Sequence, residues 1–125
     1  DDYEEGTFTI GWAGASFSSV NHTTAHYTKI GNMVYFNHFN NGMTIGSSSG
    51  NATLTGLPFT SSSTSDSYSQ FTTVYNNSID GSSPGGHIDT NSTTGYFVDL
   101  NNNAYASWIN TSGAYIMIQG FYRTA

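Results

Sequence analysis

The chain of 125 residues has no cysteine, only two prolines, and only two basic residues, Lys29 and Arg123. The absence of cysteine excludes disulfide bonds and thiolate metal ligands. With so little positive charge the chain offers no basic patch to displace counterions from phosphates, so we expect no nucleic-acid partner. No apolar run approaches the roughly 20 residues that span a bilayer, so we also expect no membrane insertion.

The composition is polar but not that of a disordered chain. Only 8% of residues are charged and 36% are hydrophobic, whereas 15% are aromatic, and disordered chains are poor in aromatic residues. Four of the eight acids lie within the first five residues, so the remainder is close to neutral despite a net charge of −6. We expect one folded domain with a surface of hydroxyl and amide groups.

The apolar pattern predicts short β-strands throughout. Residues Thr7–Trp12 alternate, which places Phe8, Ile10 and Trp12 on one face. No window combines helix formers with an apolar stripe of helical period. Further strands are predicted at His26–Ile30, Met33–Phe39, Ala52–Thr55, Phe71–Tyr75, His87–Thr90, Tyr96–Leu100, Tyr105–Ile109 and Ala114–Tyr122. The two-residue spacer Gly31-Asn32 is typical of a tight hairpin.

About nine short strands separated by Ser-, Gly- and Asn-rich loops indicate an all-β fold, an antiparallel, jelly-roll-like β-sandwich. We expect residues 7–125 to form this single domain and residues 1–6 to be a linker from an upstream region. The segments 46–50, 60–69 and 80–86 are predicted to be surface loops.

Three segments carry a resemblance to a known family. They are Asp1–Thr9 (DDYEEGTFT), His26–Val34 (HYTKIGNMV) and Leu54–Phe59 (LTGLPF). In this order and at about this spacing they resemble segments of C-terminal domains in bacteriophage tail-fibre and virion structural proteins. The resemblance covers roughly residues 1–60. The chain departs from the family pattern at Phe8, Ile10 and His26, where the family usually has Trp, Pro and Arg.

The resemblance implies a homotrimeric virion appendage with a receptor-binding role. It names no catalytic residue and does not identify the receptor. From the residues themselves, Gly56-Leu57-Pro58-Phe59 is expected to end a strand and to fold two apolar side chains over an open end of the core.

We do not expect an enzyme. Outside the first five residues the acids are Asp66, Asp80, Asp89 and Asp99. A dyad of Asp89 and Asp99 on paired strands is conceivable for glycoside hydrolysis, but solvated or turn-capping aspartates are far commoner. The chain also lacks the G-x-S-x-G elbow of a serine hydrolase. We therefore predict no catalytic residues and no cofactor.

A metal site is not predicted either. His26 and His38 lie almost symmetrically about Gly31-Asn32 and would face one another across the hairpin if the register allowed it. The favoured interpretation is two polar residues on an exposed or subunit-facing strand. No calcium-loop pattern is present.

Recognition of a glycan is the favoured function. Neutral sugars are held by aromatic faces together with short amide and hydroxyl side chains, and this sequence is rich in all of them. The candidate sugar platforms are Tyr68, Tyr105 and Trp108, because polar, loop-like runs flank them. Trp12 fits the core-facing alternation of the first strand and is interpreted as structural.

The last predicted strand, Ala114–Tyr122, is apolar on both faces. A strand covered on both sides has this pattern, so Tyr115, Met117 and Phe121 are candidates for a subunit interface in a homotrimer. The alternative is a central strand buried within one chain under long loops.

Two main function classes follow from these observations. The first is the receptor-binding domain of a phage tail fibre, located on the virion, that engages a host surface polysaccharide. The second is a structural or decoration module of a fibre or capsid without a specific ligand. A carbohydrate-binding module of a secreted enzyme is a third class, disfavoured by the acidic first residues.

Overall fold

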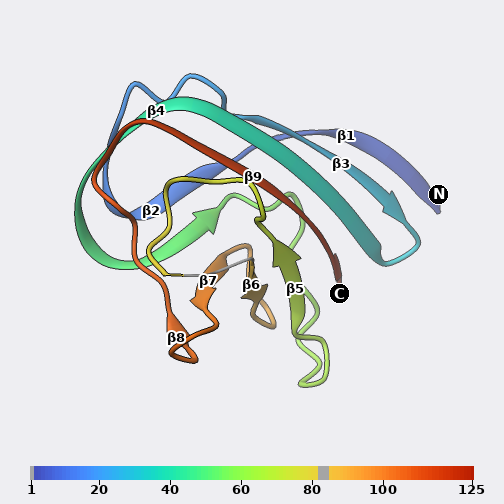
Figure 1. Cartoon of the computed structure of the whole chain (residues 1–125). Coiled ribbons are helices and arrows are strands. Elements are labelled where there is room, and N and C mark those ends of the chain that lie inside the picture. Colours follow the sequence, from blue (N-terminus) through green and yellow to red (C-terminus); the bar gives the residue numbers. More distant parts are fainter. Residues whose placement is uncertain (1, 82–84) are drawn as a thin grey trace.

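Antiparallel strands dominate the structure, a computed structural model that describes residues 2–81 and 85–125. All nine strands of the described residues belong to one sheet. The described residues contain no helix able to cross a membrane. The strands are β1 (Tyr3–Thr9), β2 (Gly11–Ser18), β3 (Thr24–Ile30), β4 (Met33–Thr55), β5 (Ser69–Thr72), β6 (Gly85–Ile88), β7 (Gly95–Asp99), β8 (Ala104–Tyr105) and β9 (Thr111–Arg123) (Figure 1).

The predicted tight hairpin is confirmed between β3 and β4, where Ile30 pairs with Met33. Gly31 has a φ of +60°, a conformation that costs glycine little because it lacks a Cβ. Asn32 does not share the positive φ, which fits a type II′ turn with glycine at its first central position. The Gly31 amide also donates a hydrogen bond to the Asp2 carbonyl at 2.6 Å, so the turn holds the start of the chain.

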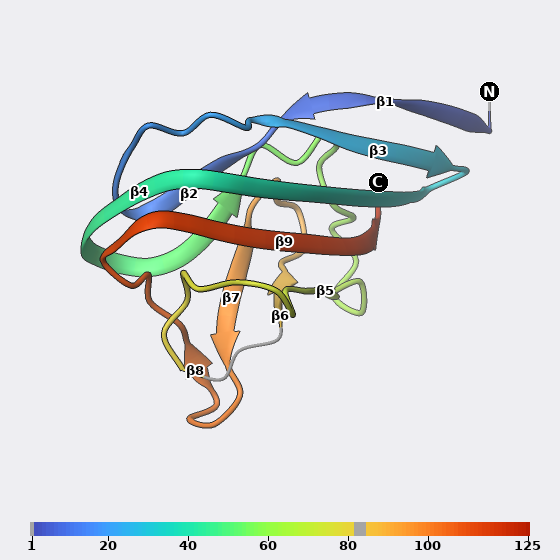
Figure 2. The same ribbon diagram turned by 45° about the horizontal axis from the view of Figure 1, so that its top comes forward.

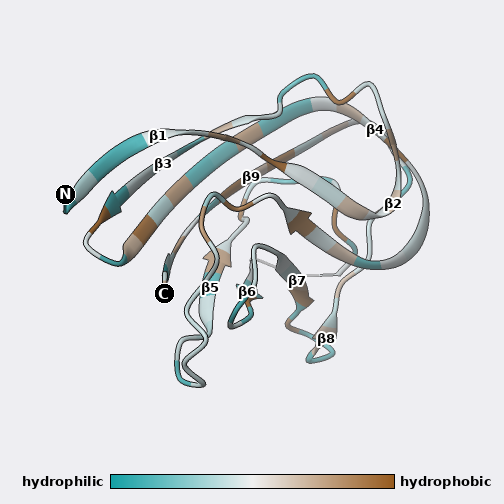
Figure 3. Ribbon diagram, turned by 180° about the vertical axis from the view of Figure 1, so that it is seen from behind, coloured by the Kyte–Doolittle hydropathy of each residue, from teal (hydrophilic) through white to brown (hydrophobic). Residues whose placement is uncertain are grey.

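β4 is a single strand of 23 residues, whereas the sequence predicted two strands joined by a loop at 46–50. Its first part alternates buried and exposed residues. Hydrophilic and hydrophobic bands both occur along the strand (Figure 3), but hydropathy does not follow burial throughout, because His38 and Asn40 are buried and Phe39 is exposed. Beyond Asn41, register shifts against β9 and β2 bend the strand, as β-bulges do. The strand then curls around one end of the molecule (Figure 1). Of the predicted loop 60–69, all but Ser69, the first residue of β5, lies outside the strands. Of the predicted loop 80–86, Gly85 and Gly86 belong to β6, and residues 82–84 lie outside the described part.

The bend in β4 closes the sheet. The first part of β4 pairs with β9 and its last part with β7, while β9–β5, β5–β6 and β6–β7 complete a ring of five strands. The all-β, nine-strand prediction is confirmed, but the jelly-roll-like sandwich is replaced by a small barrel. β1, β3 and β2 extend the sheet from β4 (Figure 2).

The first predicted strand is two strands. β1 pairs with β3 and β2 pairs with β4, and the chain changes partner at Ile10, whose amide donates to the Thr23 carbonyl. Residues 3–6, predicted as linker, belong to β1 because they pair with β3 from Tyr3 onwards. The predicted inward face is confirmed, since Ile10 is buried and Phe8 and Trp12 pack against the core.

Aromatic rings fill the barrel. Phe97 packs edge-on to Phe71 at 5.1 Å and lies 5.4 Å from Trp108. Trp108 in turn meets Trp12 and Phe17 in T-shaped contacts, a favoured geometry for aromatic pairs. Three glycines face the Phe71 side chain so closely that a Cβ on any of them would meet it at 2.6–2.9 Å: Gly86, Gly95 and Gly120.

The three segments that carried the family resemblance meet at the other end of the fold. The Tyr27 hydroxyl donates to Glu4 Oε1 at 2.7 Å, and its ring packs edge-on against Phe59 at 5.3 Å. Lys29 Nζ lies 5.7 Å from the centre of the Phe59 ring, within reach of a cation–π contact. The Tyr122 hydroxyl donates to the Phe59 carbonyl at 2.9 Å. The residues of these segments therefore contact one another and β9, and so help to hold the fold together.

Candidate ligand-binding surface

Four aromatic side chains gather on the outer face of the short strands. We call Tyr68, His87, Tyr96 and Tyr105 the tyrosine–histidine cluster. The His87 ring lies 5.8 Å from Tyr96, 5.6 Å from Tyr105 and 6.2 Å from Tyr68. Tyr96 and Tyr105 are 5.2 Å apart. Tyr68 and Tyr105 are 60% and 47% exposed, so the cluster presents ring surface to solvent.

Strand register explains the cluster. His87 on β6 is paired with Tyr96 on β7, and paired residues project to the same face of a sheet. Tyr105 on β8 pairs with Val98, two residues along β7 from Tyr96, and so lies diagonally to it on that face. Tyr68 immediately precedes β5 and reaches His87 from the other side. Each ring thus comes from a different segment.

A hollow of about 270 Å³ adjoins the cluster. His87 forms part of its wall, and Gln70, which pairs with His87 across β5 and β6, contributes an exposed amide. Val98 and Leu100 supply apolar surface. The hollow is slightly smaller than the roughly 300–1,000 Å³ of drug-sized ligand sites, a size suited to one small polar ring.

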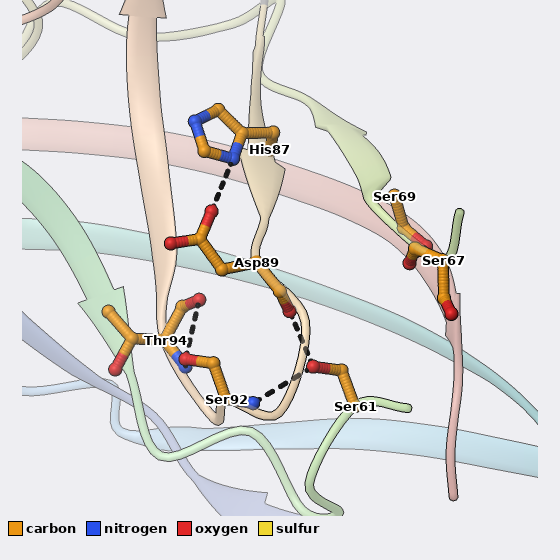
Figure 4. A network of polar contacts seen from close by, with 7 residues as sticks. All are labelled: Ser61, Ser67, Ser69, His87, Asp89, Ser92 and Thr94. Atoms are coloured by element: carbon orange, nitrogen blue, oxygen red, sulfur yellow. Dashed lines mark hydrogen bonds and ion pairs between the residues drawn. The ribbon is translucent and has the colours of Figure 1, made fainter. Parts of the chain in front are cut away.

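A polar network fixes the turn after β6 (Figure 4). His87 Nδ1 is buried and lies 2.9 Å from Asp89 Oδ1, a contact that is an ion pair when the imidazole is protonated. Ser61 Oγ donates to the Asp89 carbonyl and accepts from the Ser92 amide. Ser92 Oγ accepts from the Thr94 amide at 3.0 Å. These bonds hold Asp89 beside the cluster.

The arrangement is suited to binding a neutral, hydroxyl-rich molecule. Tyrosine faces provide apolar stacking surface and hydroxyl tips, Gln70 provides an amide, and Asp89 provides a partly exposed acceptor. No group of three or more metal-ligating side chains occurs among the residues the structure describes.

Two of the three predicted platform residues, Tyr68 and Tyr105, lie in the cluster. The third, Trp108, does not: it is only 3% exposed, and its indole N–H donates to the Ala13 carbonyl at 2.7 Å. Its flanking asparagines suggested a loop, but the ring turns into the barrel. Sequence reasoning missed His87 and Tyr96, although each lies on a predicted strand whose pairing would have placed them together.

The structure overturns the expectation that His26 and His38 face one another on an exposed strand. The hairpin pairs His26 with Asn37, so His38 is one residue out of register and lies on the opposite face. His38 is 6% exposed and its Nε2 lies 3.0 Å from the His22 carbonyl oxygen; burial lowers the pKa of this imidazole. Asp99, one of the two aspartates considered as a dyad, accepts hydrogen bonds from the Asn101 amide and from the Asn102 side chain. It therefore caps a turn, as expected for most aspartates of this chain.

The candidate interface residues lie on the outer face of β9. Met117 and Phe121 are exposed and Tyr115 is partly exposed. Tyr115 stacks on Tyr75 at 4.6 Å, and Phe121 lies 5.7 Å from Tyr35. The other face of β9 is buried in the barrel. The apolar residues on that face are therefore explained by packing within one chain. Subunit contact on the other stays a prediction.

No family model and no curated protein matches the chain. Among solved structures, the chain resembles part of the Dettilon tailspike protein (gp208), with a TM-score of 0.68 and 22% sequence identity over 97% of this chain. The match covers 24% of the tailspike chain, so the chain corresponds to about a quarter of that protein. At this identity the likeness establishes a shared fold.

Proposed function

We propose that this chain is the receptor-binding domain of a phage tail appendage, and that it binds a host cell-surface glycan through the tyrosine–histidine cluster. The observation that carries the proposal is the convergence of four rings from four segments on one exposed face. The fold shared with a tailspike supports the location on a virion.

The chemistry of the cluster favours a neutral sugar over a charged one. Stacking of ring faces on C–H surfaces uses the exposed Tyr68 and Tyr105. The carboxylate of Asp89, 2.9 Å from His87 Nδ1, would repel a carboxylated or phosphorylated sugar and accept from a hydroxyl. The role we propose is binding without catalysis.

The appendage would be a homotrimer, with the part of the outer face of β9 around Tyr115 and Met117 between subunits. Support comes from the exposed apolar side chains of Met117 and of Phe39, its partner on β4, since apolar patches mark interaction surfaces. Light scattering on the purified chain measures its mass, and a monomer at micromolar concentration contradicts the trimer.

A glycan array with the purified chain tests the binding function. We expect selective binding to neutral glycans, reduced at least tenfold by Tyr96→Ala and by Tyr105→Ala with the fold intact by circular dichroism. Tyr3→Ala is the control, because Tyr3 is an exposed tyrosine like Tyr105 but lies on β1. Failure to bind any glycan contradicts this function and favours a structural or decoration module.

A further inference from the structure

A second hollow, of about 460 Å³, lies on the outer face of β3, β4, β9 and β5. We call it the β4–β9 groove. Its volume falls within the range of small-molecule sites. None of the four rings of the tyrosine–histidine cluster is among its lining residues. Its central residues are His26, Asn37, Gln119 and Thr72, and the rings beside them are Tyr35 and Phe121.

The four polar side chains form one row across the strands. His26 pairs with Asn37, Asn37 with Gln119, and Gln119 with Thr72. All four are exposed, and directly paired residues share a face. Neighbouring strands are about 4.8 Å apart, so the row spans roughly 14 Å.

Two rings border the row one step along the strands. Tyr35 pairs with Phe121, and their ring centres are 5.7 Å apart with planes tilted by 39°. Both rings are about half exposed. The groove thus combines an amide and hydroxyl row with an aromatic border, the same pairing of chemistries as in the tyrosine–histidine cluster.

The row has unused hydrogen-bonding capacity. Within the described residues, the side chains of His26, Asn37 and Gln119 make none of the intramolecular hydrogen bonds found elsewhere in the fold. Each amide carries two donor hydrogens and an acceptor oxygen. No acidic or basic side chain apart from His26 is among the residues that line the groove. These groups match a neutral polyhydroxyl ligand.

The groove and the cluster are adjacent. Gln70 and Thr72 on β5 line both hollows, and Gln70 pairs with His87, which pairs with Tyr96. A second row, Gln70–His87–Tyr96, therefore continues from β5 where the first row ends. The two rows run from β3 over all five strands of the ring, β4, β9, β5, β6 and β7, so together they curve around the outside of the barrel.

We propose that the β4–β9 groove is a second sugar subsite, and that groove and cluster together hold one unbranched neutral oligosaccharide that curves around the outside of the barrel. This inference rests on the proposed function. A second copy of the chain is the competing occupant of the groove. It is disfavoured because close packing against a protein would require partners for the two amides and the imidazole.

The test uses an array of linear neutral glucans and galactans, each spotted from disaccharide to octasaccharide, with the full chain. The groove variant is the double change Asn37→Ala and Gln119→Ala. Asn41→Ala is its control, because Asn41 lies on the same exposed face of β4 outside the groove. Tyr96→Ala reports on the cluster.

We expect the groove variant to weaken octasaccharide binding at least tenfold and to leave disaccharide binding unchanged, whereas Tyr96→Ala weakens both. Octasaccharide binding that survives in the groove variant but is lost in Tyr96→Ala overturns the second subsite and leaves the proposed function standing. A wild-type chain that binds no glycan overturns both. A change in mass by light scattering in the groove variant, without a change in binding, assigns the groove to a second copy.

Discussion

The two sides of the barrel are built in different ways. On the long-strand side, β4 and β9 have 23 and 13 residues and pair from Met33 and Arg123 to Ile45 and Thr111. On the short-strand side, β5, β6, β7 and β8 have only four, four, five and two residues. The first side satisfies its backbone by ladder hydrogen bonds, and the second cannot do so by ladders alone.

On the short-strand side, polar side chains supply hydrogen-bond partners for backbone groups outside the strand ladders. Asn76 Oδ1 accepts hydrogen bonds from the Ser78 and Ile79 amides, each at 3.1 Å. Asn77 Oδ1 accepts from the Tyr115 amide of β9 at 2.9 Å, so the same loop is also bound to the long-strand side. Buried backbone groups need a partner, and short amide and hydroxyl side chains supply it locally. Part of the Ser- and Asn-rich composition is therefore structural.

The residues proposed to bind a ligand are also different from the residues that hold the barrel together. The tyrosine–histidine cluster lies at short strands and their loops, as binding residues often do. The rings inside the barrel, Trp108 among them, join the two sides. The following predictions test this division, from the largest expected effect to the smallest.

Removing the ring that joins the two sides is expected to cost the most. Trp108→Ala deletes a buried indole that packs on Trp12 and Phe17 and donates to Ala13, so the free energy of unfolding should fall by about 3–5 kcal/mol. Urea denaturation measures it. Tyr105→Ala, at an exposed ring of the cluster, should change stability by no more than about 0.5 kcal/mol. Equal effects would contradict the division.

Alkaline pH should weaken the long-strand side through Tyr122 of β9. Burial raises the pKa of Tyr122 from 10.0 to about 12. The unfolded chain then releases this proton first, so the contribution is complete below pH 10 and is lost as the pH rises towards about 12. Two pKa units correspond to about 3 kcal/mol. Urea denaturation between pH 9 and 12 should show a shallower decline in Tyr122→Phe; parallel curves would refute the assignment.

The junction between the two sides is tested by Gly120→Ala. A Cβ at Gly120 would lie 2.7 Å from Phe71 Cβ and 3.0 Å from its Cα, so β5 must move away from β9. Overpacking of this kind costs about 1–3 kcal/mol. Gly50→Ala is the control, since its Cβ would meet nothing within 4 Å. A thermal melt compares the two, and an unchanged melting temperature in Gly120→Ala would mean that the strands separate freely.

A smaller effect is expected from Asn76→Ala. The change removes the acceptor of the Ser78 and Ile79 amides in a buried stretch, and we expect a loss of about 1–2 kcal/mol. Hydrogen exchange should quicken at these two amides first. Asn110→Ala, at an exposed position, should leave exchange unaltered. If both variants exchange alike, side-chain acceptors do not hold this side together.

Local patterns predicted much of the fold. The alternation at Phe8, Ile10 and Trp12, the turn at Gly31-Asn32 and the nine-strand, all-β composition were all confirmed, because side-chain period and turn geometry are properties of neighbouring residues. Exposed Tyr68 and Tyr105 followed from the polar runs around them. Their meeting at His87 did not, since it depends on the order in which β5, β6, β7 and β8 pair.

What the sequence by itself determined is a chain of strands with polar loops, without cysteine and with only two basic residues. Only the tertiary structure decided that β4 continues through residues 46–50, that the sheet closes into a barrel, and that Trp108 turns inward. The physical reason is that bulges, strand order and burial depend on partners far apart in the chain. A one-residue difference in register sends a side chain to the opposite face, which separated His26 from His38.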